Sequence, residues 1–156
     1  MKNLKKLFLG VFLFMTVISV TGCGTKKAIT ADTFKTKMET KKYVVQDASS
    51  QFESNEQIKK VFLALNSASS YQIEFYEIDT VDNAVEFYTN NKLIFQQSKS
   101  SGNIETNVDL KNNSKYTLES NGMYKLISRI DKTVIYVNTS SKNKKEINKV
   151  VKELGY

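Results

Sequence analysis

The sequence predicts an α+β fold in which helices pack on one face of an antiparallel sheet. Segments with helical spacing of apolar residues alternate with groups of short segments typical of strands, and short turns join those strands. The chain contains no proline and no long Gly- or Ser-rich stretch that would divide it into domains. The expected order is a helix, three strands, a helix, four strands and a helix (α-β-β-β-α-β-β-β-β-α).

The first helix is expected over residues 30–41. Thr30 can act as its N-cap, and Asp32 lies in the first turn, where the helix dipole favours an acidic side chain. Ile29 and Phe34 occupy the two positions of a hydrophobic staple, which fixes the direction of the chain at the start of a helix. These signals place a helix at the beginning of the domain.

The other two helices follow from apolar residues repeated at i, i+3, i+4 and i+7. The second helix starts at Asp79 or Thr80 and ends near Gln97. The third covers residues 147–154, and Gly155 can serve as its C-terminal stop. The apolar stripe of the second helix consists of Val81, Ala84, Val85, Tyr88 and Phe95.

Strands are expected where β-branched and aromatic residues are bounded by turn residues. They cover residues 43–47, 61–65, 71–78, 104–110, 115–119, 123–130 and 133–138, while residues 51–57 give no clear signal. Within 104–110 apolar and polar residues alternate, which predicts one buried and one solvated face.

The turn at Asn121 and Gly122 sets the register of one hairpin. A two-residue loop would place Leu118 opposite Lys125, whereas a three-residue loop that includes Ser120 would place Leu118 opposite Tyr124. Because a slip of one residue moves every side chain to the other face, only one of these registers can be correct. We expect the three-residue loop, with Gly122 in a left-handed conformation.

Cys23 is the only cysteine of the 156-residue chain. It ends the run Val20-Thr21-Gly22-Cys23, which closes the apolar segment 7–20 after a lysine-rich start. A basic start, about 7–15 apolar residues and small residues before a cleavage point are typical of an export signal. The apolar segment is shorter than the roughly 20 residues of a membrane-spanning helix.

This run resembles the lipobox of bacterial lipoproteins. The resemblance implies that signal peptidase II cuts between Gly22 and Cys23, and that a diacylglyceryl group on the Cys23 sulfur, with acyl chains such as palmitate, holds the protein on the outer face of the cell membrane. Residues 1–22 would be the signal peptide, 23–29 a lipidated tether and 30–156 one extracytoplasmic domain. With its many lysines and single arginine, the chain is similar to small lipoproteins of Clostridium-like, low-GC Gram-positive bacteria.

The composition restricts the chemistry that this domain can perform. The chain has no histidine and no second cysteine, so Ser-His and Cys-His nucleophilic pairs and ordinary zinc sites are excluded. We therefore assign no catalytic residue, no metal and no cofactor. The net charge of +7 includes three lysines of the signal segment, and the remaining excess is too small to predict a nucleic-acid partner.

Carboxylates and tyrosines remain as candidates for a site. Glu105 and Asp109 share one strand face about 13 Å apart, at about 3.3 Å per residue, which is too far for a glycosidase pair from that strand alone. Rings on the expected strands could form a platform for sugar or peptide, but tyrosine also suits half-buried strands, and we favour that structural role. These tyrosines are Tyr71, Tyr76, Tyr116, Tyr124 and Tyr136. Arg129 is either a buried partner of an acid or a surface residue.

The sequence thus favours a membrane-anchored, extracytoplasmic binding or interaction module of the cell envelope over an enzyme. Its expected partners are the membrane, through the lipid anchor, and an envelope protein or polymer. The alternative is a small envelope hydrolase that uses carboxylates. Desolvated acids that converge in a cleft would favour the hydrolase, and a solvent-facing aromatic or apolar patch would favour the module.

Overall fold

The computed structural model describes residues 25–156. Helix α1 (Ala31–Thr40) is followed by strand β1 (Val44–Asp47), a 3-10 turn η1 (Ser49–Phe52) and strands β2 (Ile58–Leu65) and β3 (Gln72–Ile78). Helix α2 (Val81–Gln97) precedes strands β4 (Ile104–Asp109), β5 (Asn113–Ser120), β6 (Met123–Ile130) and β7 (Thr133–Ser140). A 3-10 turn η2 (Ser141–Asn143) leads into helix α3 (Lys144–Glu153). The α+β class is confirmed, and the two 3-10 turns are elements that the expected order lacks.

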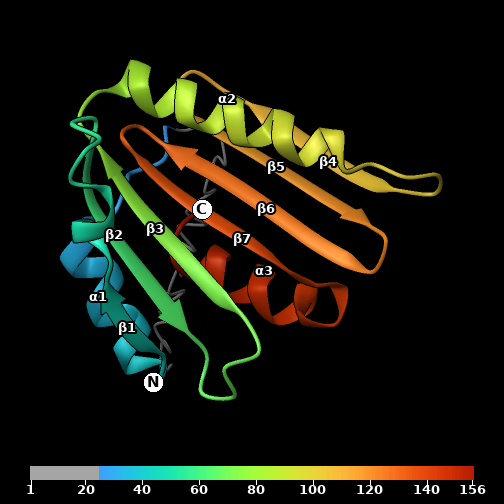
Figure 1. The fold of residues 1–156 in the computed structure, drawn as a ribbon, viewed down its shortest axis with the longest axis horizontal. Helices are drawn as coiled ribbons and strands as arrows, with labels where there is room; N and C mark the ends of the chain where they lie inside the picture. The colour runs from blue at the N-terminus through green and yellow to red at the C-terminus, as the bar shows by residue number, and fades with distance from the viewer. Residues whose placement is uncertain (1–24) are drawn as a thin grey trace, which may run out of the picture.

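The strands form one 7-stranded sheet in the order β1-β2-β3-β7-β6-β5-β4, with every neighbouring pair antiparallel (Figure 1). The chain builds β1 to β3 as one half of the sheet and then crosses it through α2. It forms β4 to β7 as the second half, and β7 returns to pair with β3. Strands β1 and β4 are therefore the two edges.

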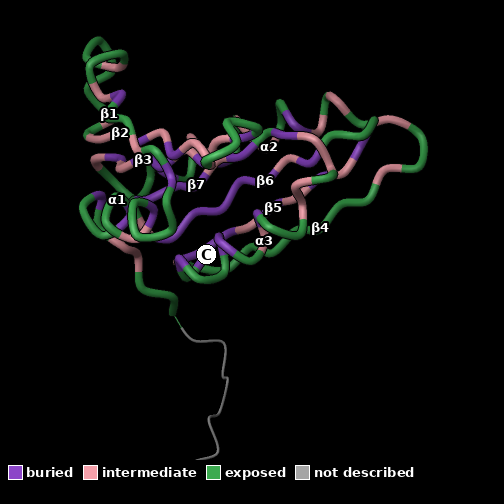
Figure 2. The backbone as a smooth tube through the Cα atoms, turned by 90° about the horizontal axis from the view of Figure 1, so that it is seen from below, coloured by how far each residue is buried: buried purple, intermediate pink, exposed green. Residues whose placement is uncertain are grey.

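The helices cover both faces of the sheet, so the expected placement on one face is wrong. Phe34 of α1 and Ile147 of α3 belong to one core, whereas Phe95 of α2 belongs to a second core across the sheet. Figure 2 shows α2 on one side and α1 and α3 on the other, and we call these sides the α2 face and the α1/α3 face. The physical reason lies in the central strands: Leu126 of β6 faces the first core and Ile127 the second, so each face needs its own cover.

The first two helices begin at threonine caps. The hydroxyl of Thr30 accepts from the backbone N–H of Thr33 at 3.2 Å, and that of Thr80 accepts from the N–H of Asn83 at 3.1 Å. The carboxylate of Asp79 accepts from the N–H of Thr80 and the amide of Asn83, which reinforces the same turn. The N-cap predicted at Thr30 is confirmed, and Thr80 rather than Asp79 caps α2.

The hairpin of β5 and β6 closes with a two-residue turn. Asn121 and Gly122 have φ values of 52° and 72°, so both are left-handed, as a type I′ turn requires. Leu118 pairs with Lys125. The expected three-residue loop is wrong, although the left-handed Gly122 is confirmed. The long stem of Lys125 can pack where the apolar pattern predicted a ring, and its ammonium lies 5.5 Å from the centre of the Phe95 ring.

The edge strand β4 differs from its predicted pattern of one buried and one solvated face. All six residues of β4 are exposed. Ile104 is 60% and Val108 47% exposed, although alternation with polar neighbours predicted that they would be buried. The described residues therefore cover the apolar side of this strand only in part.

Candidate functional site

Strands β3 and β7 join the two halves of the sheet over a short stretch only. Their pairing runs from Glu74 with Tyr136 to Glu77 with Thr133, whereas β7 stays paired with β6 as far as Ser140. Beyond Glu74 the two strands diverge (Figure 1). The gap holds a cleft of about 410 Å³, whose lining includes Leu65, Gln72, Glu74, Met123, Asn138 and Thr139. Polar side chains from both halves of the sheet therefore meet in one cleft.

Glu74 is the acidic residue of this cleft, and side chains of its own strand hold its carboxylate. The hydroxyl of Tyr76 donates to Oε2 at 2.5 Å, and Nε2 of Gln72 donates to Oε1 at 2.8 Å. These alternate residues of β3 share the α2 face. Burial, and then the charge of Glu74, raise the pKa of Tyr76 above its usual value, so its hydroxyl stays a donor at neutral pH. The fixed carboxylate keeps lone pairs for a ligand donor.

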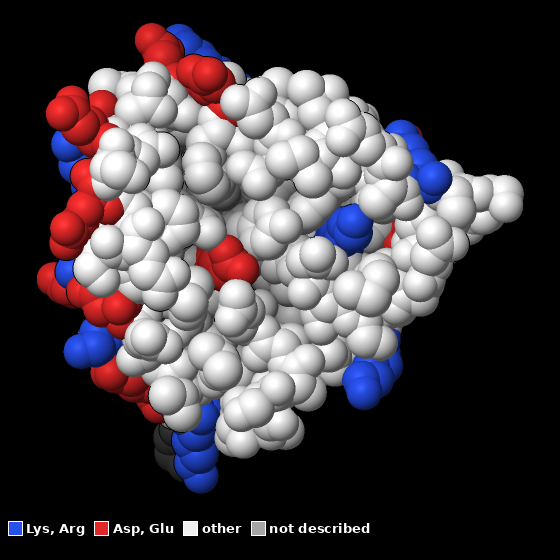
Figure 3. All heavy atoms as spheres, viewed as in Figure 1, with Lys and Arg blue, Asp and Glu red and all other residues white. Residues whose placement is uncertain are grey.

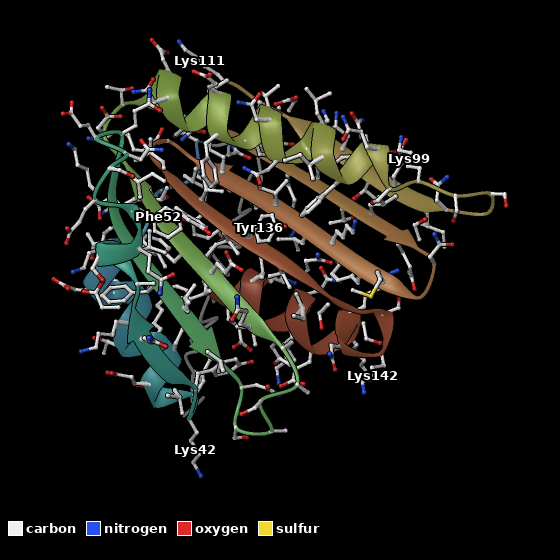
Figure 4. All side chains as sticks on the ribbon, viewed as in Figure 1. Lys42, Phe52, Lys99, Lys111, Tyr136 and Lys142 are labelled. Carbon is white, nitrogen blue, oxygen red and sulfur yellow. The ribbon has the colours of Figure 1, made fainter. Side chains whose placement is uncertain are left out.

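Aromatic side chains from several elements lie beside Glu74 on the α2 face. Phe52 of η1 meets Tyr76 edge-on with ring centres 5.9 Å apart, and Phe87 of α2 lies 4.8 Å from the same ring. Tyr136 is the cross-strand neighbour of Glu74 on β7. Figure 4 shows Phe52 and Tyr136 on the same face of the sheet. Phe52, Phe87 and Tyr136 are only half-buried, so this aromatic group reaches the surface next to the cleft.

A lysine, Lys125, lies on the strand next to β7, one strand beyond the cleft. Lys125 of β6 pairs with Asn138, which lines the cleft, and its Nζ donates to the hydroxyl of Ser98 at 2.5 Å. Figure 3 views this face and shows that its middle is largely uncharged, with most acidic groups at one margin. The lining of the cleft therefore offers one acidic group, Glu74, and no basic group within a mainly neutral polar surface, which suits an uncharged ligand.

The tyrosines expected on strands do not form one shared platform. Tyr71 and Tyr124 belong to the core of the α1/α3 face, whereas Tyr76 and Tyr116 belong to the core of the α2 face, and all four are buried. Tyr136 is half-buried and lies beside the cleft. The favoured structural role is confirmed for the four buried rings, of which Tyr71, at 6% exposure, also lines the cleft.

The acidic residues considered at the sequence level are engaged separately. Glu105 accepts from Lys99 at 2.6 Å and from the hydroxyl of Tyr116 at 2.6 Å, and these two donors lower the pKa of its carboxyl. Asp109 accepts from the hydroxyl of Ser114 at 2.6 Å. In the described part of the chain, no group of three or more His, Cys, Asp and Glu side chains is placed to hold a metal ion. Glu74 has no second acid in the lining of its cleft.

Sequence reasoning missed the cleft residues that face Glu74. Gln72, Met123 and Asn138 line the cleft, yet no motif or spacing marks them. The cleft depends on where β3 and β7 separate, and these strands are far apart in the sequence. The cleft could have been predicted only if β3 and β7 had been recognised as neighbouring strands, since their pairing places Glu74 beside Tyr136.

The predicted lipid-attachment and cleavage residues, Cys23 and Gly22, lie outside the described residues. Among residues 25–156, no helix has the length and apolar character needed to cross a membrane.

Comparisons with known proteins give little guidance. No protein-family model matches the chain, and no curated protein matches it. Among solved structures, the chain is similar to a GTP-binding regulator from Thermotoga maritima, with 18% sequence identity and a TM-score of 0.49. The match covers 81% of this chain and 85% of the other. A likeness at this level supports no argument about this protein, so its function has to be inferred from its own residues.

Proposed function

We propose that the protein is a lipid-anchored, extracytoplasmic binding module of the cell envelope, and that it holds a saccharide segment of an envelope polymer in the cleft between β3 and β7. The observation that carries the proposal is the Glu74 carboxylate, held by Tyr76 and Gln72 at the edge of a polar cleft. The lipobox-like run that ends at Cys23 supports the location.

The lining of the cleft favours a sugar for chemical reasons. Sugar hydroxyls are donors and acceptors at once, and they need carboxylate, amide and hydroxyl groups at several points. Glu74 supplies acceptors, Gln72 and Asn138 carry amides, and Ser140 carries a hydroxyl. Tyr136 adds a ring beside Glu74 against which the apolar side of a sugar can pack.

The anchor explains how weak binding at such an open site would suffice. The expected tether over residues 23–29 is shorter in the structure, because Ala28 and Ile29 pack on the core and the carbonyl of Lys26 accepts from Asn112. Only the three residues from Cys23 up to Lys26 remain as a link, which spans at most about 11 Å. A domain held this close to the membrane meets envelope polymers at a high local concentration, which relaxes the affinity that each contact must supply.

The test is to titrate the protein with soluble fragments of cell-wall polysaccharide and follow binding by calorimetry. We expect Glu74→Gln to weaken binding by about tenfold or more, because hydrogen bonds to a charged group contribute about 1.5–3 kcal/mol. Tyr136→Ala should weaken binding as well. The matched control is Glu77→Gln, since Glu77 lies on the same strand and its side chain alternates to the opposite face.

If Glu77→Gln weakened binding as much as Glu74→Gln, the assignment of the binding site to the cleft would be wrong. Wild-type protein that binds none of the fragments would contradict the saccharide proposal itself. Thermal unfolding of each variant shows whether a loss reflects the site or the fold.

A further inference from the structure

An apolar stripe runs along the edge strand β4 and continues just beyond it. Ile104 is 60%, Val108 47% and Leu110 43% exposed, and Thr106 stands between them. These alternate residues point to one side of the sheet. An exposed apolar row on an edge strand is a liability in a soluble protein unless something covers it.

The stripe lies on the α1/α3 face. Ile104 pairs across the ladder with Glu119, and Glu119 accepts from Lys144 at the start of α3 at 2.5 Å. The hydroxyls of Thr106 and Thr117 are 2.7 Å apart on the same side. The stripe is therefore on the face opposite to α2 and the Glu74 cleft.

The first described residues reach the same face at one end of the stripe. The side-chain amide of Asn112, in the β4–β5 turn, donates to the backbone carbonyl of Lys26 at 2.7 Å. Lys115 pairs with Val108, and burial followed by the nearby charge of Lys26 lowers the pKa of Lys115. Figure 2 shows the chain leaving the domain on the side of α1 and α3. Since Cys23 precedes Lys26 by three residues, its Cα lies within about 11 Å of the Lys26 Cα.

We infer that the β4 stripe, formed by Ile104, Thr106, Val108 and Leu110, rests on the surface of the lipid bilayer that holds the anchor. The inference rests on the proposed lipid anchor at Cys23. An anchor attached this close to Lys26 brings the adjacent face to the membrane, and the apolar side chains with Lys26 and Lys115 beside them match the apolar and basic groups that bind membrane interfaces. The Glu74 cleft then faces away from the membrane, toward the envelope.

The structure provides a matched pair of positions for a test. Val108 is 47% exposed on the stripe, and Leu93 is 50% exposed on α2, across the sheet. Because Cys23 is the only cysteine and the lipid would block its sulfur, a cysteine introduced by Val108→Cys or Leu93→Cys would carry the only reactive thiol. Each lipidated full-length variant is labelled with a small fluorophore and placed in vesicles that contain phosphatidylglycerol and lipids with headgroup quenchers.

We expect at least about twofold more quenching at position 108 than at position 93, because an interfacial face sinks about 5–10 Å into the headgroup region. Adding Ile104→Asn and Leu110→Asn to the Val108→Cys variant should reduce that difference. Equal quenching at both positions, in protein whose mass includes the diacylglyceryl group, would overturn the inference and leave the anchor intact.

A mass without lipid on Cys23 would instead count against the proposed anchor. The same two labelled variants would then be prepared with Cys23→Ala and held on nickel-chelating lipids by a hexahistidine tag in place of residues 1–22. Preferential quenching at position 108 in that arrangement would support the membrane-facing stripe, and equal quenching would reject it.

Discussion

Gly122 occupies a backbone conformation that few other residues accept. Its φ of 72° is left-handed, and a Cβ built on it would meet nothing within 4 Å. A substitution there would therefore be strained by its own backbone and not by neighbouring atoms. We expect Gly122→Val to lower the free energy of unfolding by about 1–2 kcal/mol, measured by urea denaturation. Gly122→Asn is the control and should cost much less, because asparagine tolerates this region; equal losses would contradict the turn.

Asp47 is a residue whose contribution to stability should depend on pH. Its carboxylate accepts from Lys60 at 2.5 Å and from the hydroxyl of Ser49 at 2.6 Å, and these partners lower its pKa from 3.8 to about 2. Because the pKa of Asp47 is lower in the folded than in the unfolded protein, the ionised carboxylate stabilises the fold at pH values above the unfolded pKa. This stabilisation is lost as the pH falls toward 2.

We therefore expect Asp47→Asn to destabilise the protein at neutral pH by up to about 1 kcal/mol, since the pair is partly exposed. The difference in the free energy of unfolding between wild type and variant should disappear as the pH falls from about 4 to about 2. Urea unfolding at neutral pH, near pH 4 and near pH 2 measures it. A gap that stays constant over this range would show that the carboxylate charge is not responsible.

Arg129 shows what composition can and cannot reveal about a residue. A single arginine among many lysines marks the position, and the sequence left it either buried against an acid or at the surface. The structure places it at 2% exposure, where its guanidinium donates to the carbonyls of Asn112 and Asp131 and to the hydroxyl of Ser114. These partners lie in turns and on a neighbouring strand, so no local pattern could identify them.

At the level of elements, local signals were sufficient to locate the helices. The caps and apolar spacing that predict a helix act within a few residues, so α1 and α2 begin where Thr30 and Thr80 indicate. We expect Thr80→Ala to cost about 1 kcal/mol, because the N–H of Asn83 loses its acceptor. Thermal unfolding measures the change, with Thr89→Ala in the exposed middle of α2 as control. Equal costs for the two substitutions would contradict the role of the cap.

Faces and registers of strands were harder to predict than their positions. The sequence of β6 does not alternate cleanly, because Lys125, Ser128 and Arg129 interrupt its apolar residues. It therefore shows neither that helices cover both sides nor which residues pair across the Asn121–Gly122 turn. The candidate cleft could not be predicted from the sequence for a related reason. It exists because β3 and β7 part beyond Glu74, and that separation is a property of the sheet and not of either strand alone.

For the whole molecule, the central expectation is attachment through Cys23. We expect Cys23→Ala to shift the protein from the membrane fraction to the soluble fraction, because the acyl chains on this sulfur would provide most of the membrane affinity. Fractionation of cells and mass spectrometry of the purified protein measure the change. The conservative Thr21→Ser is the control and should leave the lipid in place. A Cys23→Ala protein that remains in the membrane pellet like wild type would refute the anchor.

The position of β7 in the sheet has a consequence for how the domain assembles. β7 is the last described strand in the chain, yet it lies between β3 and β6. Until residues 133–140 insert as a strand, β3 and β6 each have an unpaired edge. The pairing of β7 with β3 joins segments that are distant in the sequence, and such contacts slow folding. If the proposed export and N-terminal lipidation hold, the chain would be tethered to the membrane before its central strand could insert. The domain would then complete its folding at the bilayer surface.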